Sequence, residues 1–276
     1  VRVEQPDTLF YLTDLFTGYA VDYVAEAAQT DSPFFLYLAY TAPHWPLHAL
    51  PEDIARYEGK YLGGWDSLRQ GRYNRQLALG LLDSGQAPLS PRFARVPEWE
   101  TVSDSMRRVY DRRMAVYAAM VDRMDQQIGR LLAELEETGA AENTLLVFLS
   151  DNGASRAEGT GYLHPRFDRS APVGSPQSFE GYGQHWANVS DAPFRRFKSE
   201  VHEGGIATPF IAWWPGQLPA GRIEQETYGH IADLLPTLVA AAGATPPAGL
   251  DGIDLLPLWQ NQGRPAPRPL VWEHYG

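Results

Sequence analysis

Three largely apolar stretches divide the sequence and predict buried strands. They cover residues 34–40, 144–149 and 206–214, and each is bounded by polar residues, glycine or proline. Apolar runs that do not alternate with polar residues are typical of strands buried on both faces of a parallel sheet. We therefore expect three such strands.

Helical periodicity fills the sequence between these stretches. Apolar residues recur every three or four positions within residues 13–29 and, over a longer segment, within residues 104–137. Gly139 is expected to end the longer helix, and a further helix over 230–242 contains Pro236 near its start. Because helices and buried strands alternate, the pattern predicts an α/β fold with a mixed, mainly parallel sheet sandwiched by helices.

Residues 154–192 form a long segment without clear periodicity, rich in glycine, serine, proline and aromatic residues. Loops of this length in a compact domain are usually functional or mobile, so we interpret the segment as a substrate-facing lid. His164, His185 and Trp186 are its candidate substrate contacts. Ordinary packing within the loop is the interpretation that we favour for each of them.

Composition excludes several classes of function. The net charge is −11, and no run rich in lysine or arginine occurs, which argues against nucleic-acid or membrane-surface binding. No apolar stretch approaches the roughly 18 to 20 residues that span a bilayer. The chain has no cysteine, hence no disulfide and no thiol nucleophile. Compartment and oligomeric state stay open.

Two polar residues, Asp151 and Asn152, follow the apolar run at 144–149 and precede Gly153. Ligand sites in open α/β sheets lie beyond the carboxyl ends of the strands, where these side chains would be placed. A carboxylate beside a carboxamide offers hard oxygen ligands, which suit Ca²⁺ or Mg²⁺ better than zinc or copper. The alternative interpretation is a polar turn at a strand end.

His44 follows the apolar run at 34–40 between two prolines, which restrict the backbone that presents it. An imidazole at that edge of the sheet can bind an anion or protonate a leaving group. The alternative is a loop histidine packed beside Trp45. His48 has no strand to place it, and we expect it at the surface or behind the site.

Lys198 follows two arginines and precedes the pair Gly204-Gly205. It is interpreted either as part of a solvated basic patch or as a lysine that faces an anion. Asp122 and Asp125, on the helix predicted over 104–137, are expected to be solvated or structural because nothing around them suggests a pocket.

Four motifs occur in a fixed order that spans almost the entire chain. They are Thr41-Ala42-Pro43-His44-Trp45-Pro46, Ser150-Asp151-Asn152-Gly153-Ala154, Phe197-Lys198 with His202-Glu203-Gly204-Gly205-Ile206, and Asp233-Leu234-Leu235-Pro236-Thr237. Together they strongly resemble the sulfatase family, and arylsulfatases most of all, within the alkaline-phosphatase-like superfamily. Each motif alone is weak, but four in the family's order make chance agreement improbable.

The resemblance implies roles for the matching residues. Asp151 and Asn152 match the family's second pair of calcium ligands. His44 matches the histidine that contacts the sulfate and the ester oxygen, and Lys198 matches the lysine that reaches the same oxygens. The resemblance also implies Ca²⁺ in preference to Mg²⁺, a formylglycine nucleophile, and a small-molecule or carbohydrate sulfate ester as substrate.

One departure from the family concerns the nucleophile. Sulfatases make formylglycine from the first residue of a C/S-x-P-x-R motif, whereas this chain has no cysteine and its nearest match, residues 170–174, ends in glycine. The paired acids and the Lys-x-His segment that normally precede the matched part are also absent. The first residue is Val1 and both ends look cut. We therefore expect residues 1–276 to be a partial catalytic domain, without the nucleophile-bearing part and the small C-terminal subdomain, and inactive by itself.

The expected activity of the full-length parent is sulfuric ester hydrolysis. Two alternatives stay open at this point. One is a phosphonate monoester or phosphodiester hydrolase of the same superfamily, and the other is a non-catalytic binding protein on the same fold.

Overall fold

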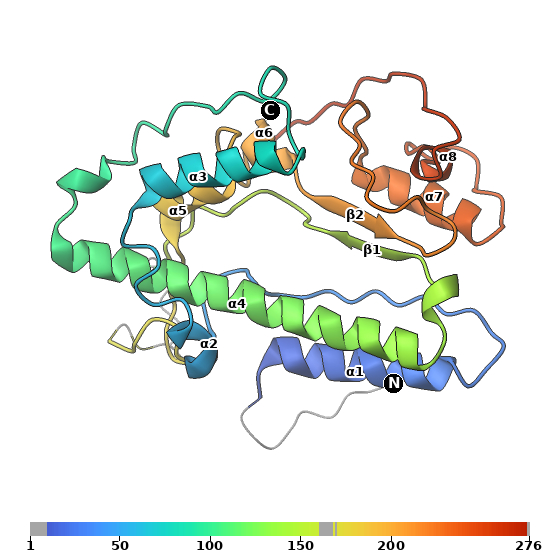
Figure 1. The fold of residues 1–276 in the computed structure, drawn as a ribbon, viewed down its shortest axis with the longest axis horizontal. Helices are drawn as coiled ribbons and strands as arrows, with labels where there is room; N and C mark the ends of the chain where they lie inside the picture. The colour runs from blue at the N-terminus through green and yellow to red at the C-terminus, as the bar shows by residue number, and fades with distance from the viewer. Residues whose placement is uncertain (1–9, 160–167, 169, 275–276) are drawn as a thin grey trace.

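The computed structural model describes residues 10–159, 168 and 170–274, and one long helix runs through it (Figure 1). This helix, α4, spans Asp104–Glu137 and is capped at its N-terminus by Ser103, whose hydroxyl accepts a hydrogen bond from the Met106 backbone. It ends before Gly139, which has a positive φ of 73°. Helix α1 (Leu12–Ala27) lies along α4. Both predicted long helices are thus confirmed.

The sheet has two strands within the described residues. Strands β1 (Leu146–Leu149) and β2 (Phe210–Trp213) pair antiparallel, with Leu146 opposite Trp213 and Leu149 opposite Phe210. Two of the three predicted strands therefore form, each shorter than expected. The mainly parallel sheet sandwiched by helices is not seen in this part of the chain, because its two strands run in opposite directions and no parallel neighbour pairs with them.

Residues 34–40 are extended but form no strand, so the prediction of a buried strand there is wrong for this structure. Leu36 and Leu38 pack against a core cluster between α1 and α4, whereas Phe35 and Tyr37 are 80% and 82% exposed. Side chains alternate as in a strand. One face of this segment is therefore in solvent, and no backbone hydrogen bond joins residues 34–40 to another described segment.

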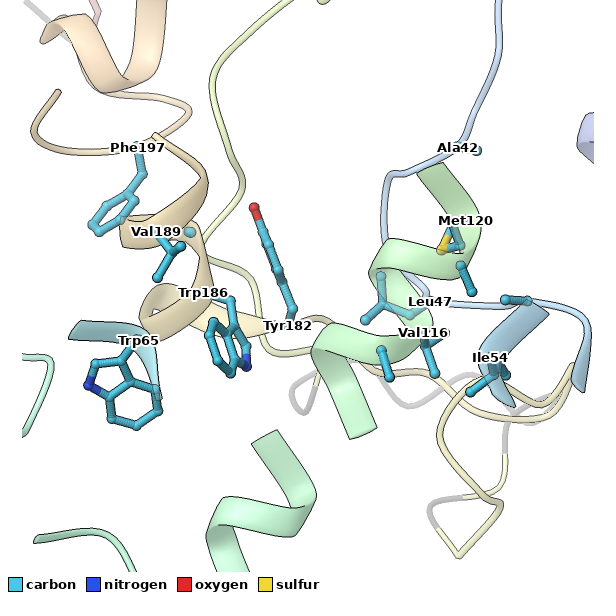
Figure 2. Packing of buried hydrophobic residues seen from close by; sticks show 14 of the residues in the cluster. Ala42, Leu47, Ile54, Trp65, Val116, Met120, Tyr182, Trp186, Val189 and Phe197 are labelled. Atoms are coloured by element: carbon cyan, nitrogen blue, oxygen red, sulfur yellow. The ribbon is translucent and has the colours of Figure 1, made fainter. Parts of the chain in front are cut away.

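The larger hydrophobic core joins α4 to the loop that carries His44 and to helix α5 (Gly183–Ser190). Figure 2 shows Leu47 and Val116 on one side of this core, Trp65 and Trp186 on the other, and Tyr182 between them. Trp65 and Trp186 are essentially buried, with their rings edge to face. Part of the predicted lid is therefore core.

Short helices complete the fold and follow the remaining hydrophobic segments. Helix α7 (Leu234–Ala241) has Pro236 in its first turn, where proline is tolerated, and confirms the helix predicted there. The other elements are α2 (Pro51–Ala55), α3 (Trp65–Ala78), η1 (Trp99–Thr101), η2 (Ala141–Asn143), α6 (Glu203–Ile206), η3 (Ile231–Asp233) and α8 (Leu256–Trp259). Within the described ranges, no helix is long and apolar enough to cross a membrane.

Candidate functional site

His44 and Lys198, which lie 154 residues apart in the sequence, meet in the structure. The Lys198 Nζ lies 3.5 Å from the His44 Nε2. The His44 Nδ1 lies 2.5 Å from the carbonyl oxygen of Trp45, which can only accept a hydrogen bond, so Nδ1 carries the proton. In the neutral ring, Nε2 is then the acceptor that faces the lysine ammonium. Two of the candidate catalytic groups therefore converge on one point.

The loop of His44 is tied down on the side that faces the core. Leu47 is 1% exposed, and its backbone N–H donates to the Glu180 carbonyl over 2.8 Å. The His48 ring nitrogen Nε2 lies 2.8 Å from the Ser178 carbonyl oxygen, so His48 holds this loop from behind. The His44 ring is exposed and stacks on Trp45 with 5.5 Å between ring centroids. His44 therefore packs beside Trp45, with its ring open to solvent.

Residues 191–205, which we call the Lys198 loop, are held in place by close backbone packing. Phe197 is fully buried against Phe93, which anchors the loop next to Lys198. A Cβ added to Gly204 would overlap the carbonyl oxygens of the residues at 195 and 196, and one added to Gly205 would overlap those at 197 and 200. The glycine pair is thus required by space and not only by backbone flexibility.

Asp151 and Asn152 lie where the chain leaves β1, against the same glycine pair. The Gly153 backbone N–H donates to the Gly205 carbonyl over 3.1 Å, and a Cβ on Gly153 would overlap the carbonyl of Gly204. The Asn152 Nδ2 donates to the Gly153 carbonyl, and its Oδ1 makes no hydrogen bond within the described residues. The turn after β1 and the Lys198 loop are therefore packed directly on each other.

Two oxygen-bearing side chains at this turn could bind a divalent cation. Within the described ranges, no hydrogen bond or ion pair engages the exposed Asp151 carboxylate, and the Asn152 Oδ1 is a second hard oxygen beside it. These two groups fit Ca²⁺ or Mg²⁺ in kind. They do not reach the six to eight oxygens typical of Ca²⁺, and the described residues hold no group of three or more His, Cys, Asp or Glu that could bind a metal.

The other candidate residues that the structure describes lie in the core or on the surface of a helix. His185 and Trp186 are buried in α5, as the packing interpretation predicts, and burial lowers the pKa of His185 below its usual value. Asp122 forms an ion pair with Arg56, and Asp125 is exposed on α4. His164 lies outside the described residues.

Asp191 is a residue that the sequence did not single out. Its Oδ1 accepts a hydrogen bond of 2.8 Å from the Ala154 backbone N–H, two residues after Asn152. Burial raises its pKa to about 7, although the Ala154 hydrogen bond and the charge of Arg72 act in the opposite direction. A lone aspartate at the end of a predicted loop gives no sequence signal for such a contact.

Comparisons with known proteins agree on one family. Residues 2–244 match the family model described as Sulfatase. An arylsulfatase of Klebsiella aerogenes is 39% identical over 264 residues, which cover 93% of this chain and 56% of the relative. The chain therefore spans about half the length of that relative.

Solved structures support the α/β class. The crystal structure of Ps i-CgsB in complex with k-i-k-neocarrahexaose is 26% identical, with a TM-score of 0.57 over 94% of this chain and 40% of that one. The phosphonate monoester hydrolase of Agrobacterium radiobacter is 22% identical, with a TM-score of 0.53 over 94% of this chain and 45% of that one, which shows the fold alone. Since the family match covers most of the sequence and contains His44, Asp151, Asn152 and Lys198, the chain belongs to the sulfatase family.

Proposed function

We propose that the protein hydrolyses sulfate monoesters and that His44 and Lys198 act on the sulfate group. The observation that carries this proposal is the 3.5 Å approach of Lys198 Nζ to His44 Nε2 in a chain of the sulfatase family. A lysine and a histidine from distant segments share one exposed point, which suits a small tetrahedral anion. The similarity to an arylsulfatase supports sulfate as that anion.

Lys198 stabilises negative charge in this mechanism. As the ester bond breaks, charge grows on the sulfuryl oxygens and on the leaving oxygen. The ammonium of Lys198 offers three donors and a full positive charge to these oxygens, and the packed loop around it fixes its position before the reaction. One well-placed donor of this kind is typically worth about 3 to 4 kcal/mol of transition-state stabilisation.

His44 is proposed as the acid that protonates the leaving oxygen. The hydrogen bond from Nδ1 to the Trp45 carbonyl fixes the ring, so Nε2 is the atom that points to the substrate. In the resting site, Nε2 accepts from Lys198. Once Nε2 of the exposed ring has taken up a proton from solvent, the imidazolium donates that proton to the departing alcohol or phenol. Substrates whose leaving groups are poor depend most on this step.

Asp151 and Asn152 are proposed as ligands of a Ca²⁺ ion. The unengaged carboxylate and the outward amide oxygen provide two of its oxygen ligands, and further ligands must come from other groups. A bound divalent cation would supply positive charge to the sulfate oxygens. Because the turn that bears both residues packs on the Lys198 loop, the ion and the lysine would lie on neighbouring backbone segments.

The proposed nucleophile is a formylglycine that residues 1–276 do not provide. The chain has no cysteine, and residues 170–174 fail the C/S-x-P-x-R pattern at their last position. We therefore treat these residues as part of a sulfatase catalytic domain, active only together with a nucleophile from elsewhere in the protein. The proposed substrates are small aryl or carbohydrate sulfate esters.

The test is the substrate preference of the full-length protein. We expect a higher kcat/KM for 4-nitrophenyl sulfate than for bis(4-nitrophenyl) phosphate or a phenylphosphonate monoester, and loss of turnover after chelation of divalent cations. A clear preference for the phosphorus esters would mean that the protein is a phosphonate monoester or phosphodiester hydrolase instead. Sulfate binding without turnover of any ester would indicate a binding protein.

A further inference from the structure

A single residue, Ala154, connects the two loops of the site through its backbone N–H and its backbone carbonyl. The backbone N–H of Ala154 donates to Asp191 Oδ1 over 2.8 Å, and its carbonyl accepts from the Lys198 backbone N–H over 3.0 Å. Ala154 comes two residues after Asn152 in the turn that leaves β1. The proposed metal ligands and the proposed catalytic lysine are thus held in register by hydrogen bonds on both sides of one residue.

Asp191 stands where helix α5 gives way to the Lys198 loop. Its backbone N–H donates to the Ala187 carbonyl in the last turn of α5, and its own carbonyl accepts from Phe194 over 2.8 Å. Its side chain reaches back to Ala154. Asp191, the first residue of the Lys198 loop, is therefore also hydrogen-bonded to the turn that bears Asp151 and Asn152.

We propose that Asp191 is a positioning residue that fixes the Asp151–Asn152 turn relative to Lys198 through the Ala154 N–H. This inference rests on the proposed function for its effect on turnover, although the hydrogen-bond arrangement itself does not depend on that function. Asp191 touches neither the sulfate nor the metal in this scheme. It acts through the backbone that carries the groups that do.

The hydrogen bond from Ala154 requires only an acceptor oxygen at Asp191, which the carboxyl provides in either protonation state. Its Oδ2 is buried and has no hydrogen-bond partner among the described residues. The groups that interact electrostatically with Asp191 are the Arg72 guanidinium from α3 and the phenols of Tyr117 from α4 and Tyr182. Burial raises the pKa of both phenols, whereas the charge of Arg72 lowers the pKa of Asp191. An amide at position 191 would keep the acceptor and remove the charge.

Three variants of the full-length protein separate these roles. Asp191→Ala removes the acceptor, and Asp191→Asn keeps it. Asp111→Ala is the matched control, because Asp111 also accepts backbone N–H groups, those of Gly59 and Tyr61, in a loop without a candidate site residue. Hydrogen exchange of the Ala154 and Lys198 amides, Ca²⁺ affinity and kcat/KM for 4-nitrophenyl sulfate are measured below the unfolding temperature of every variant.

We expect Asp191→Ala to speed exchange at Ala154 and Lys198 at least tenfold, and to lower Ca²⁺ affinity and kcat/KM by about 10- to 100-fold, the usual effect of losing a supporting contact behind metal ligands. Asp191→Asn should stay within about threefold of wild type in all three measurements. Asp111→Ala should lower thermal stability but leave these readouts within the same range.

Two results would overturn the proposal. One is wild-type amide exchange, Ca²⁺ affinity and turnover in folded Asp191→Ala; the other, which remains decisive if that variant does not fold, is an Asp191→Asn protein that folds but loses Ca²⁺ affinity tenfold or more. A wild-type protein that hydrolyses no sulfate ester would instead refute the proposed function, while amide exchange would still test the role of Asp191.

Discussion

Two aspartates, the buried Asp233 and the half-buried Asp191, hold distant segments together in this protein, and their hydrogen-bonding capacity is satisfied to different degrees. Asp233 accepts from the backbone of His230 and of Ile253 and forms an ion pair with Arg268. Asp191 accepts one hydrogen bond from Ala154, and its other oxygen is buried without a partner in the described part of the chain. Both oxygens of Asp233 are thus satisfied in a purely structural contact, whereas Asp191 supports the loops that carry the proposed site residues. Full satisfaction favours stability, and incomplete satisfaction occurs where the fold presents the site.

The largest effect is expected where the site loops touch. Gly153→Ala would force a Cβ into the carbonyl of Gly204, so the turn after β1 and the Lys198 loop must separate. We expect a loss of about 4 kcal/mol or more in the free energy of unfolding and no measurable turnover, as judged by chemical denaturation and assay. Gly129→Ala in α4 is the control, because nothing lies within 4 Å of its Cβ. A Gly153→Ala protein with wild-type stability would show that the loops are not in contact.

Replacing Asp233 should affect stability alone. Asp233→Ala leaves the Arg268 guanidinium without its carboxylate and removes the acceptor for two backbone N–H groups. We expect a loss of about 3 kcal/mol in the free energy of unfolding by denaturant titration. Turnover of the folded fraction should be unchanged. A fall in kcat/KM without a matching loss of stability would mean that Asp233 also contributes to the site.

His44→Ala tests a proposed catalytic side chain that faces solvent and contributes little to stability. Its ring is exposed, so we expect less than about 1 kcal/mol of stability to be lost. Turnover should fall about 100-fold for sulfate esters of poorly acidic alcohols and less for 4-nitrophenyl sulfate, because only the former need a proton. Equal losses across leaving groups would show that His44 binds the anion and does not act as an acid.

The smallest effect is a pH dependence that arises from Asp191. Because burial raises its pKa to about 7, the folded protein holds a proton that the unfolded chain has released between about pH 4 and pH 7. The free energy of unfolding should therefore fall as pH rises through this window, by about 2 kcal/mol for a partly shielded carboxyl. Asp191→Asn should lack this fall when denaturation is measured at several pH values. A parallel slope in wild type and variant would assign the pH dependence to another group.

The sequence predicted local features well and long-range contacts poorly. The helix over residues 104–137 followed from its apolar spacing, whereas no spacing or periodicity in the sequence pointed to the approach of His44 to Lys198. Residues 34–40 failed as a buried strand because a strand needs a neighbouring backbone, which an apolar run does not itself provide. Asp191 was missed because its contact is with the backbone of a residue 37 positions earlier, and any side chain at Ala154 would offer the same N–H.

The most direct test of the account is the effect of Lys198→Ala on kcat/KM for 4-nitrophenyl sulfate in the full-length protein, with the free energy of unfolding measured on the same samples. Because Lys198 is placed to face substrate, we predict a loss of about 100- to 1,000-fold in kcat/KM with a change in stability of less than about 1 kcal/mol. Wild-type turnover in this variant would contradict the assignment of the site and, with it, the proposed mechanism.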